Sequence, residues 1–544
     1  MLTHAKRTAG RTVQRVCALL VVALGLIRSQ PAPDTQPQLP LDKLWVLEGA
    51  VIDDRGPVPG ASIRAIGHGQ DFAALTNEKG HYVLTGTVPG KYSIYPAKEG
   101  YEGGEDGDSQ NAIRIDLAGG AHVKDADFFV HKAASISGRI LDTNRKPVQG
   151  AGVVLYAKRF GEHREFLQTR EGVESDASGD YHFAAIRAGT YYLCVHLPLR
   201  DNAGSPRGSQ RLRSPQPATV PVGTCYPNSI YFENAAPIYV HRAEHLEGLD
   251  LVMNQASTFC VAGKLGPVVE QIPGKARLAV AQLVGSTWAG FVGSGDAQAG
   301  EDFEVCDLPA GSYAIIIVAM GNEKLAGFVS RAFTVTNRDV AVGELYLQPP
   351  SPLRGKLNLA GIPEDSPFPA GIRVELWPLN RPNRFAGEGR LGHPNLKGEF
   401  SIEDVLADDF QLRVGNLPSG FYLKSVMQRS RDVTFNSVHP GDDLTITLSS
   451  DGPVISGETL NKENVPVHDA TVILIPKDQS LSSIVSTRSS RNGGFQFQSG
   501  IAPGEYAIIA LTNLFDGEDQ NPDFVRDQMT LATRLALDKK EPNR

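Results

Sequence analysis

The chain repeats one pattern of short segments about five times, and this internal repeat limits the possible fold more than any single motif does. The first copy contains Leu47-Glu48-Gly49-Ala50, then Lys79-Gly80-His81-Tyr82-Val83-Leu84, and then Val88-Pro89-Gly90-Lys91-Tyr92. Each segment is apolar at alternate positions or ends in a glycine or proline turn. A pattern of this kind predicts a series of small modules in place of one large core.

The second and fifth copies keep the pattern closely, and the third and fourth keep it loosely. The fourth copy has Ala407-Asp408-Asp409-Phe410 where the other copies have a turn that ends in glycine. The matching segments are 136–141, 175–183 and 188–191 in the second copy, 261–264 and 308–313 in the third, 353–356 and 397–400 in the fourth, and 455–459, 491–495 and 503–506 in the fifth.

The local chemistry of the repeat favours strands joined by tight turns. Alternation such as Tyr82-Val83-Leu84 suits a strand with one buried face, and glycine in the turns tolerates positive φ. We expect the Pro-Gly step before the tyrosine to form a type II turn. Strands at this spacing predict an all-β chain of sandwich modules, without an amphipathic helix in the repeats. A tyrosine follows that turn in four copies, at 92, 191, 313 and 506, which indicates a structural element of the sandwich.

These motifs resemble the carboxypeptidase regulatory-like family, over roughly residues 45–515. The resemblance implies a prealbumin-like (transthyretin-like) sandwich of about seven strands, related to the immunoglobulin-like and carbohydrate-binding-like folds. It implies no peptidase activity, because this module is the non-catalytic part of the carboxypeptidases that contain it. A fold of this kind says little about its ligand.

The repeat predicts the domain organisation of the chain. We expect the second module to be long, with 226–253 adding a pair of extra strands. The fifth module is expected to lack its last strand after Leu537, which would leave an exposed sheet edge. The expected segments are a signal peptide at 1–29, a Pro-rich linker at 30–43, and modules at 44–132, 133–255, 256–350, 351–450 and 451–544.

The N-terminal segment has the layout of a secretory signal peptide. Basic residues from Lys6 to Arg15 precede an apolar run at 16–27, and a polar, Pro-rich stretch follows. The run would rise only ~18 Å as a helix, against a bilayer core of ~30 Å, so a stable transmembrane span is disfavoured. An uncleaved anchor is the alternative. We therefore expect an exported chain that is periplasmic, outer-membrane-associated or extracellular.

The charge of the chain argues against a nucleic acid as partner. Removal of residues 1–29 takes away five Lys or Arg and no acid, which changes the net charge from −8 to −13. An acidic chain repels phosphate backbones, so the charge mainly favours solubility.

Four cysteines remain after the signal segment, namely Cys194, Cys225, Cys260 and Cys306. An even number in an exported chain permits two disulfides, and three pairings are open. We favour Cys194 with Cys225 and Cys260 with Cys306, because each pair would close a loop within one module. Free buried thiols are the alternative. No Cys-x-x-Cys occurs, so we predict no metal site on these residues.

One segment matches a zinc-peptidase signature, His241-Arg242-Ala243-Glu244-His245. That motif works on a helix, where residues four apart share a face, yet both flanks of this segment are strand-like. We interpret it as a polar hairpin tip. The chain has no G-x-S-x-G, H-E-x-x-H or P-loop motif, so we predict no enzymatic activity and no cofactor.

Two further groups of residues bear on binding. The acidic loops at 102–108 and 516–523 hold carboxylates that could bind Ca²⁺, but neither has a calcium-loop spacing, so we expect solvated loops. Sugar binding would use exposed aromatic rings, and Trp45, Trp288 and Trp377 are expected in strands as core residues.

The prediction from sequence is an exported, non-catalytic scaffold whose modules bind a protein or glycan at the cell surface. One alternative is a carbohydrate-binding array. The lesser alternative is a zinc metallopeptidase, or a peptidase accessory protein.

Overall fold

The chain is almost entirely β-structure, with one short α-helix among the residues described below. The structure is a computed structural model, and it describes residues 44–104, 112–161, 164–196, 219–269, 272–284, 287–321, 324–362, 368–379, 390–478 and 483–539. The predicted signal peptide and Pro-rich linker lie outside these ranges. No helix within them is long and apolar enough to cross a bilayer.

The first sandwich shows the plan that the others vary. Its first strand pairs antiparallel with two strands and parallel with the last two strands of the same sandwich. One sheet contains β2 (Gly56–Pro57), β1 (Trp45–Asp53), β5 (His81–Gly86), β8 (His122–Val123) and β9 (Phe128–Phe129). The facing sheet has the order β4 (Gln70–Leu75), β3 (Ser62–Gly67), β6 (Gly90–Ala97) and β7 (Ile113–Leu117).

The second and third sandwiches repeat this plan. In the second, one sheet contains β13 (Asp180–Ile186), β10 (Ala134–Leu141), β18 (His245–Leu246) and β19 (Leu251–Val252), and the other contains β12 (Arg164–Glu174), β11 (Gly152–Gly161), β14 (Gly189–His196), β16 (Thr224–Cys225) and β17 (Ile238–Val240). In the third, one sheet has the order β24 (Asp302–Leu308), β21 (Phe259–Leu265) and β27 (Val340–Leu345). The other has the order β23 (Thr287–Gln298), β22 (Lys275–Val284), β25 (Gly311–Gly321) and β26 (Lys324–Val335). A short ribbon of β15 (Thr219–Pro221) and β20 (Gln255–Ser257) lies between them.

The fourth and fifth sandwiches depart from the plan. In the fourth, β33 (Tyr422–Gln428) belongs to the sheet of the first strand and not to the facing sheet. One sheet has the order β31 (Glu399–Val405), β28 (Ser351–Ala360), β35 (Leu444–Ser449), β33 and β34 (Arg431–Asp432), and the facing sheet has the order β30 (Arg390–Gly392), β29 (Arg373–Pro378) and β32 (Phe410–Gly415). In the fifth, β36 (Ile455–Glu458) pairs only with β39 (Gly494–Phe497) among the described strands, and they face β38 (Val485–Arg488), β37 (Thr471–Pro476), β40 (Gly504–Leu511) and β41 (Thr533–Leu537).

Alternating burial explains why these segments form strands, as predicted. Along β5 the side chains of Tyr82 and Leu84 are buried and those of His81 and Val83 are exposed. The buried side chains of the two sheets meet in one core for each of the first four sandwiches. The core of the fourth also takes in Ala281, Ile316 and Phe328 of the third, so these two sandwiches share apolar contact.

Three local predictions need correction. The glycines of the expected type II turns, Gly90 and Gly504, have φ of 147° and 158°, well above the ~80° of that turn, and they begin β6 and β40. The segments expected as extra strands of the second sandwich include its regular closing strands β17, β18 and β19, while the added strands are β15 and β16. A helix also lies within the fifth copy, α1 (Pro522–Gln528), preceded by the 3-10 turn η6 (Glu518–Gln520).

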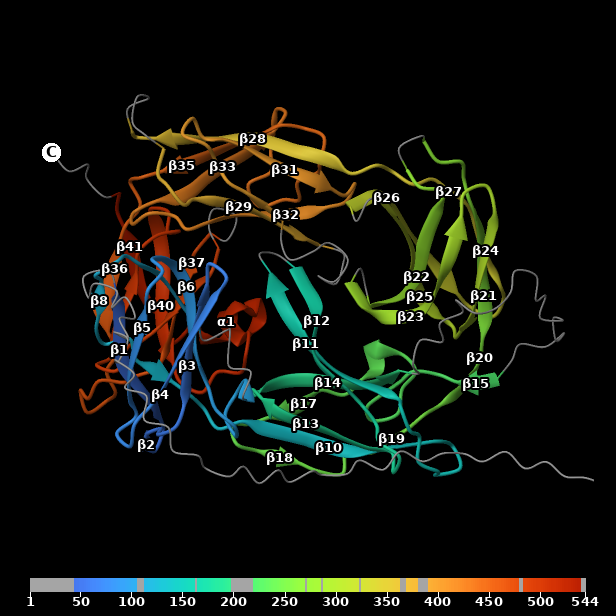
Figure 1. Ribbon diagram of the computed structural model, residues 1–544, viewed down its shortest axis with the longest axis horizontal. Coiled ribbons are helices and arrows are strands. Elements are labelled where there is room, and N and C mark those ends of the chain that lie inside the picture. Colours follow the sequence, from blue (N-terminus) through green and yellow to red (C-terminus); the bar gives the residue numbers. More distant parts are fainter. Residues whose placement is uncertain are drawn as a thin grey trace, which may run out of the picture.

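The five sandwiches form a closed ring, a shape that the sequence left open (Figure 1). Neighbours along the chain touch through the backbone, as where Gly103 N donates to Ala185 O at 3.2 Å and Gly420 N donates to Gln498 O at 2.7 Å. The fifth sandwich closes the ring, because it contacts the first and second sandwiches as well as the fourth.

Candidate functional site

The most elaborate polar site is the place where the fifth sandwich meets the first and second, which we call the closing joint. Its charged side chains come from segments that lie hundreds of residues apart in the chain. They are Glu102, His131, Arg159, Arg170, Arg187, Arg242, Asp469, Arg488, Asp516 and Asp519.

Asp469 is the first of two buried carboxylates in the closing joint. It accepts hydrogen bonds from His131 Nε2 of the first sandwich at 2.8 Å and from Arg488 Nη1 of its own sandwich at 2.6 Å. The guanidinium Nη2 of Arg242, from the second sandwich, lies 3.9 Å from Asp469 Oδ2. Burial raises the pKa of the Asp469 carboxyl, but the hydrogen bond from His131 and the charge of Arg488 outweigh it, so this pKa lies below its ordinary value.

Asp516 is the second buried carboxylate, and it ties the fifth sandwich to the second. It accepts from Arg170 Nη2 at 2.8 Å and forms a further ion pair with Arg159. The side chains of Arg159, Arg170 and Asp516 keep only 11%, 13% and 22% of their accessible surface. Burial raises the pKa of the Asp516 carboxyl, and the two guanidinium groups more than reverse this, so the pKa is lowered.

The closing joint encloses a polar cavity of about 250 Å³. His131 lines it and is 6% exposed, and its Nδ1 has no hydrogen-bond partner among the described residues. Rings also stack across the joint, since Phe129 and His468 have centroids 4.5 Å apart and nearly parallel planes. The joint therefore combines charge pairing with ring contacts, and its geometry is that of a fixed connection between sandwiches.

A half-buried histidine, His196, lies on the third-sandwich side of the second sandwich. Tyr156 Oη and His196 Nε2 are hydrogen-bonded at 3.0 Å, and a side chain at Gly290 of the third sandwich would meet the same tyrosine hydroxyl at 2.8 Å. Burial lowers the pKa of His196 to about 4, so the imidazole is neutral at pH 7.

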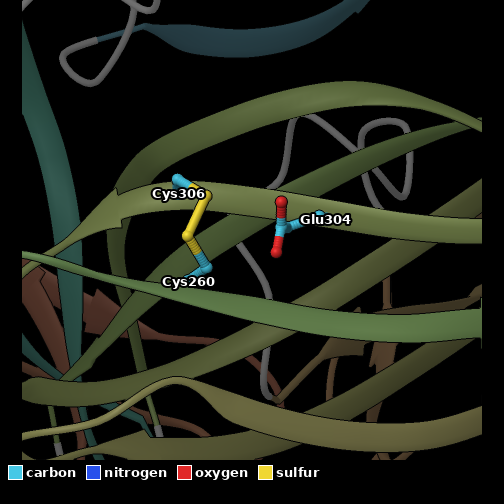
Figure 2. Close-up of side chains that lie close together, drawn as sticks. All are labelled: Cys260, Glu304 and Cys306. Atoms are coloured by element: carbon cyan, nitrogen blue, oxygen red, sulfur yellow. A yellow bond between two sulfur atoms is a disulfide. The ribbon is translucent and has the colours of Figure 1, made fainter. Parts of the chain in front are cut away.

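Both pairs of cysteines that the sequence favoured are joined as disulfides. Cys194 and Cys225 face each other on the paired strands β14 and β16, with S–S 2.04 Å. Cys260 and Cys306 join β21 and β24, with S–S 1.99 Å. Figure 2 shows Glu304 beside the second disulfide, and these three residues are the one group of possible metal ligands that converges within the described ranges. The disulfide leaves no thiolate to bind a metal there.

The zinc-peptidase signature does not lie on a helix. Residues 241–244 form a turn between β17 and β18, and these strands lie in different sheets and do not pair with each other. The segment is therefore a polar turn that crosses between sheets, not the tip of a hairpin as we expected. His245 Nδ1 lies 2.8 Å from Ser135 Oγ, and Glu244 Oε2 accepts from the backbone N of His241 at 2.7 Å. Among the described residues these three side chains form no group of converging metal ligands, and Glu244 and His245 have hydrogen bonds to other groups instead.

The acidic loop at 516–523 is not the solvated loop that we expected. Its first carboxylate, Asp516, is buried against two arginines, and Asp519 accepts from Ser486 Oγ at 2.6 Å. The expectation was wrong because no local pattern shows which distant cations a carboxylate meets. Most of the other acidic loop, from residue 105 onward, lies outside the described residues.

The aromatic predictions have separate outcomes. Trp45 is fully buried, as expected of a core residue, whereas Trp377 is partly exposed with the Arg413 guanidinium 5.6 Å from its ring centroid. The side chain of Trp288 lies outside the described part.

The four equivalent tyrosines each donate a hydrogen bond to the carbonyl four residues earlier, which confirms them as a structural element: Tyr92 to Val88, Tyr191 to Arg187, Tyr313 to Pro309 and Tyr506 to Ala502.

Sequence reasoning missed the arginines of the closing joint and the helix next to it. Arg159 and Arg170 are single basic residues in strand-like segments, and nothing local distinguishes them from surface residues. The helix α1 did have a readable signal, because Asn521 caps it and Pro522 occupies its first turn.

Known proteins give only a distant likeness. No family model and no curated protein matches the chain. Among solved structures, the Bacillus anthracis TIE protein is 13% identical over 56% of this chain and 51% of its own, with a TM-score of 0.16. A streptococcal ancillary pilin is 11% identical over 56% of this chain and 99% of its own (TM-score 0.17), and the major pilin BcpA of Bacillus cereus is 10% identical over 59% and 100% (TM-score 0.14). The chain thus spans about half the length of the TIE protein, and these likenesses carry no argument about function.

Proposed function

We propose that the chain is an exported, non-catalytic scaffold that holds binding surfaces in fixed positions at the cell envelope. The observation that carries this proposal is the closing joint, in which buried ion pairs join the fifth sandwich to the second and a buried hydrogen bond joins it to the first. A chain of freely moving modules gains nothing from such pairs, because burying charges is costly unless the geometry is maintained. Fixed sandwiches that present loops and sheet edges suit recognition of an envelope protein.

The finer predictions from sequence belong to this proposal. The modules are prealbumin-like units of the kind found in the carboxypeptidase regulatory-like family, with boundaries near residues 132, 255, 350 and 450. The layout of residues 1–29 supports export, and the two disulfides suit an oxidising compartment. The two carboxylates at the centre of the closing joint, Asp469 and Asp516, are both paired with arginines, which supports a structural role for them.

Two results would decide the matter. The chain, expressed with its natural N-terminus in its own cells, should leave the cytoplasm without residues 1–29, as mass spectrometry of the exported fraction would show. Photo-crosslinking groups at exposed loop positions of that chain should then capture one defined envelope protein. Retention of the intact chain in the cytoplasm would contradict the proposal. So would peptide hydrolysis by the purified chain that is lost on His245→Ala.

A further inference from the structure

In each of the first four sandwiches, a closing segment runs parallel to the first strand and passes directly over its central glycine. A Cβ at that glycine would overlap a backbone oxygen of the closing segment. The distances would be 2.2 Å from Gly49 to Ala126 O, 2.4 Å from Gly138 to Leu249 O, 2.9 Å from Gly263 to Gly343 O, and 2.7 Å from Gly355 to Leu444 O. The close approach of the closing segment therefore explains why glycine occupies this position.

The fifth sandwich keeps the glycine, and no described segment passes over it. Gly457 lies in the middle of β36, and the three atoms nearest to a Cβ built there all belong to the Phe495 side chain. β36 pairs with β39 on one side, and no described strand pairs with its other side. At this glycine the nearest neighbour is thus a side-chain ring of the same sandwich, 2.7 Å from such a Cβ, and not the backbone of a closing segment.

The backbone groups that bind the closing segment elsewhere have no such partner among the described residues of the fifth sandwich. In the second sandwich Ser137 O accepts from Leu249 N at 3.1 Å, and Arg139 N donates to Asp250 Oδ1 at 2.9 Å. The first sandwich repeats both bonds, with Glu48 O and Ala50 N bound to Ala126 N and Asp127 Oδ1. The equivalent residues of β36 are Ser456 and Glu458, which are exposed, and no described residue outside β39 pairs with their backbone.

The closing segments share a pattern of side chains. A residue with a side-chain acceptor precedes an apolar residue that is buried, and a second apolar residue follows two positions later. The four versions are Asp127-Phe128-Phe129-Val130, Asp250-Leu251-Val252-Met253, Glu344-Leu345-Tyr346-Leu347 and Thr445-Ile446-Thr447-Leu448. The first apolar residue is at most 2% exposed in every case.

The core of the fifth sandwich is correspondingly thin. Between its sheets it has five buried apolar residues, against fifteen in the first sandwich. Val454 and Leu460, which flank β36, remain 38% and 48% exposed. An added apolar segment would cover this surface, as the closing segments do in the other sandwiches.

We propose that the open edge of β36 binds an extended segment of another protein, which lies parallel to β36 and supplies the two apolar side chains of the closing pattern. Strand addition to an exposed edge gives affinity through backbone hydrogen bonds and specificity through alternate side chains. This proposal deepens the scaffold function, on which it rests, by locating one binding surface and giving the chemistry of the segment that it takes.

The charge of Glu458 determines which residue the bound segment carries before its apolar pair. In the second and third sandwiches a basic residue lies opposite an acidic one, Arg139 beside Asp250 and Lys264 paired with Glu344. Glu458 reverses the sign at this position, and like charges directly opposite each other are destabilising. The bound segment therefore has a neutral acceptor such as Asn, Ser or Thr at this position, not Asp or Glu.

The test uses the chain's own closing segment as a probe. A fluorescent peptide of residues 247–254 and its Asp250→Asn form are titrated against the full chain and against its Glu458→Lys variant. The natural chain should bind the Asn form roughly two- to fivefold more tightly than the Asp form, and the variant should reverse this order. A Leu251→Ser peptide, which lacks the first apolar residue, should bind neither protein.

Hydrogen exchange locates the binding. The Asn peptide should slow exchange of the Glu458 amide in the natural chain and not in a Gly457→Ala variant, whose fold is checked by unchanged exchange at β37 and β40. Absence of binding by both peptides would overturn the proposal, as would the same affinity order for both proteins. Protection of the Glu458 amide before any peptide is added would also overturn it, because the chain or a second copy would then fill the edge. None of these failures affects the scaffold function, which is tested by export and crosslinking.

Discussion

Loss of the Asp516 carboxylate should open the ring at the closing joint. Asp516→Asn keeps the size of the side chain and removes the charge that faces Arg159 and Arg170, both of which are nearly buried. Removal of one partner from a buried ion pair costs about 3–5 kcal/mol, because the remaining charge is left uncompensated. The 22% exposure of the Asp516 side chain favours the lower end of this range, about 3 kcal/mol.

Hydrogen exchange measures this opening without unfolding the whole chain. The Asp516 amide donates to Ala188 O across the joint at 3.2 Å, so its exchange reports separation of the fifth sandwich from the second. A loss of about 3 kcal/mol would speed this exchange by roughly a hundredfold. Asp523→Asn is the matched control, because its ion pair with Arg526 is exposed and worth about 0.5 kcal/mol or less. Equal exchange in the two variants would refute the reasoning.

Further predictions concern pH, the disulfides and the tyrosines. His196 has a pKa lowered to about 4 in the folded chain, so below its ordinary pKa of ~6.5 the unfolded chain binds the extra proton and stability falls as the pH drops from about 6.5 to 4, by at most about 3.4 kcal/mol. His196→Gln should flatten this part of a stability profile measured by chemical denaturation. Reduction of the Cys194–Cys225 disulfide, which closes a 31-residue separation, should destabilise the second sandwich by about 3.7 kcal/mol. Hydrogen exchange of the β14 amides with and without reductant would measure the loss, and an unchanged exchange rate would argue against a structural role for the disulfide. Tyr313→Phe removes the hydrogen bond to Pro309 O and should lower the stability of the third sandwich by about 1 kcal/mol. Unchanged hydrogen exchange of the amides in that sandwich would show that the bond is dispensable.

The sequence predicted the sandwiches well because their determinants are local. The alternation at 81–84, the glycine turns and the tyrosines at 92, 191, 313 and 506 all act within a few residues. The two favoured cysteine pairs lie within single sandwiches for the same reason, with separations of 31 and 46 residues.

The ring could not be predicted because its determinants lie far apart in the chain. His131 and Asp469 are 338 residues apart, and neither belongs to a recognisable motif. The acidic loop that contains Asp516 looked solvated for the same reason. The special position of Gly457 could not be recognised from the sequence either, because it required the distances at the four equivalent glycines.

The closed ring is the central claim, and small-angle X-ray scattering of the full chain without residues 1–29 tests it most directly. Sandwiches of about 100 residues have a radius of gyration near 13 Å, so five of them in contact around a ring give about 30 Å, and five in line give about 50 Å. We predict a value near 30 Å that increases in the Asp516→Asn variant. A value near 50 Å for the natural chain would contradict the account.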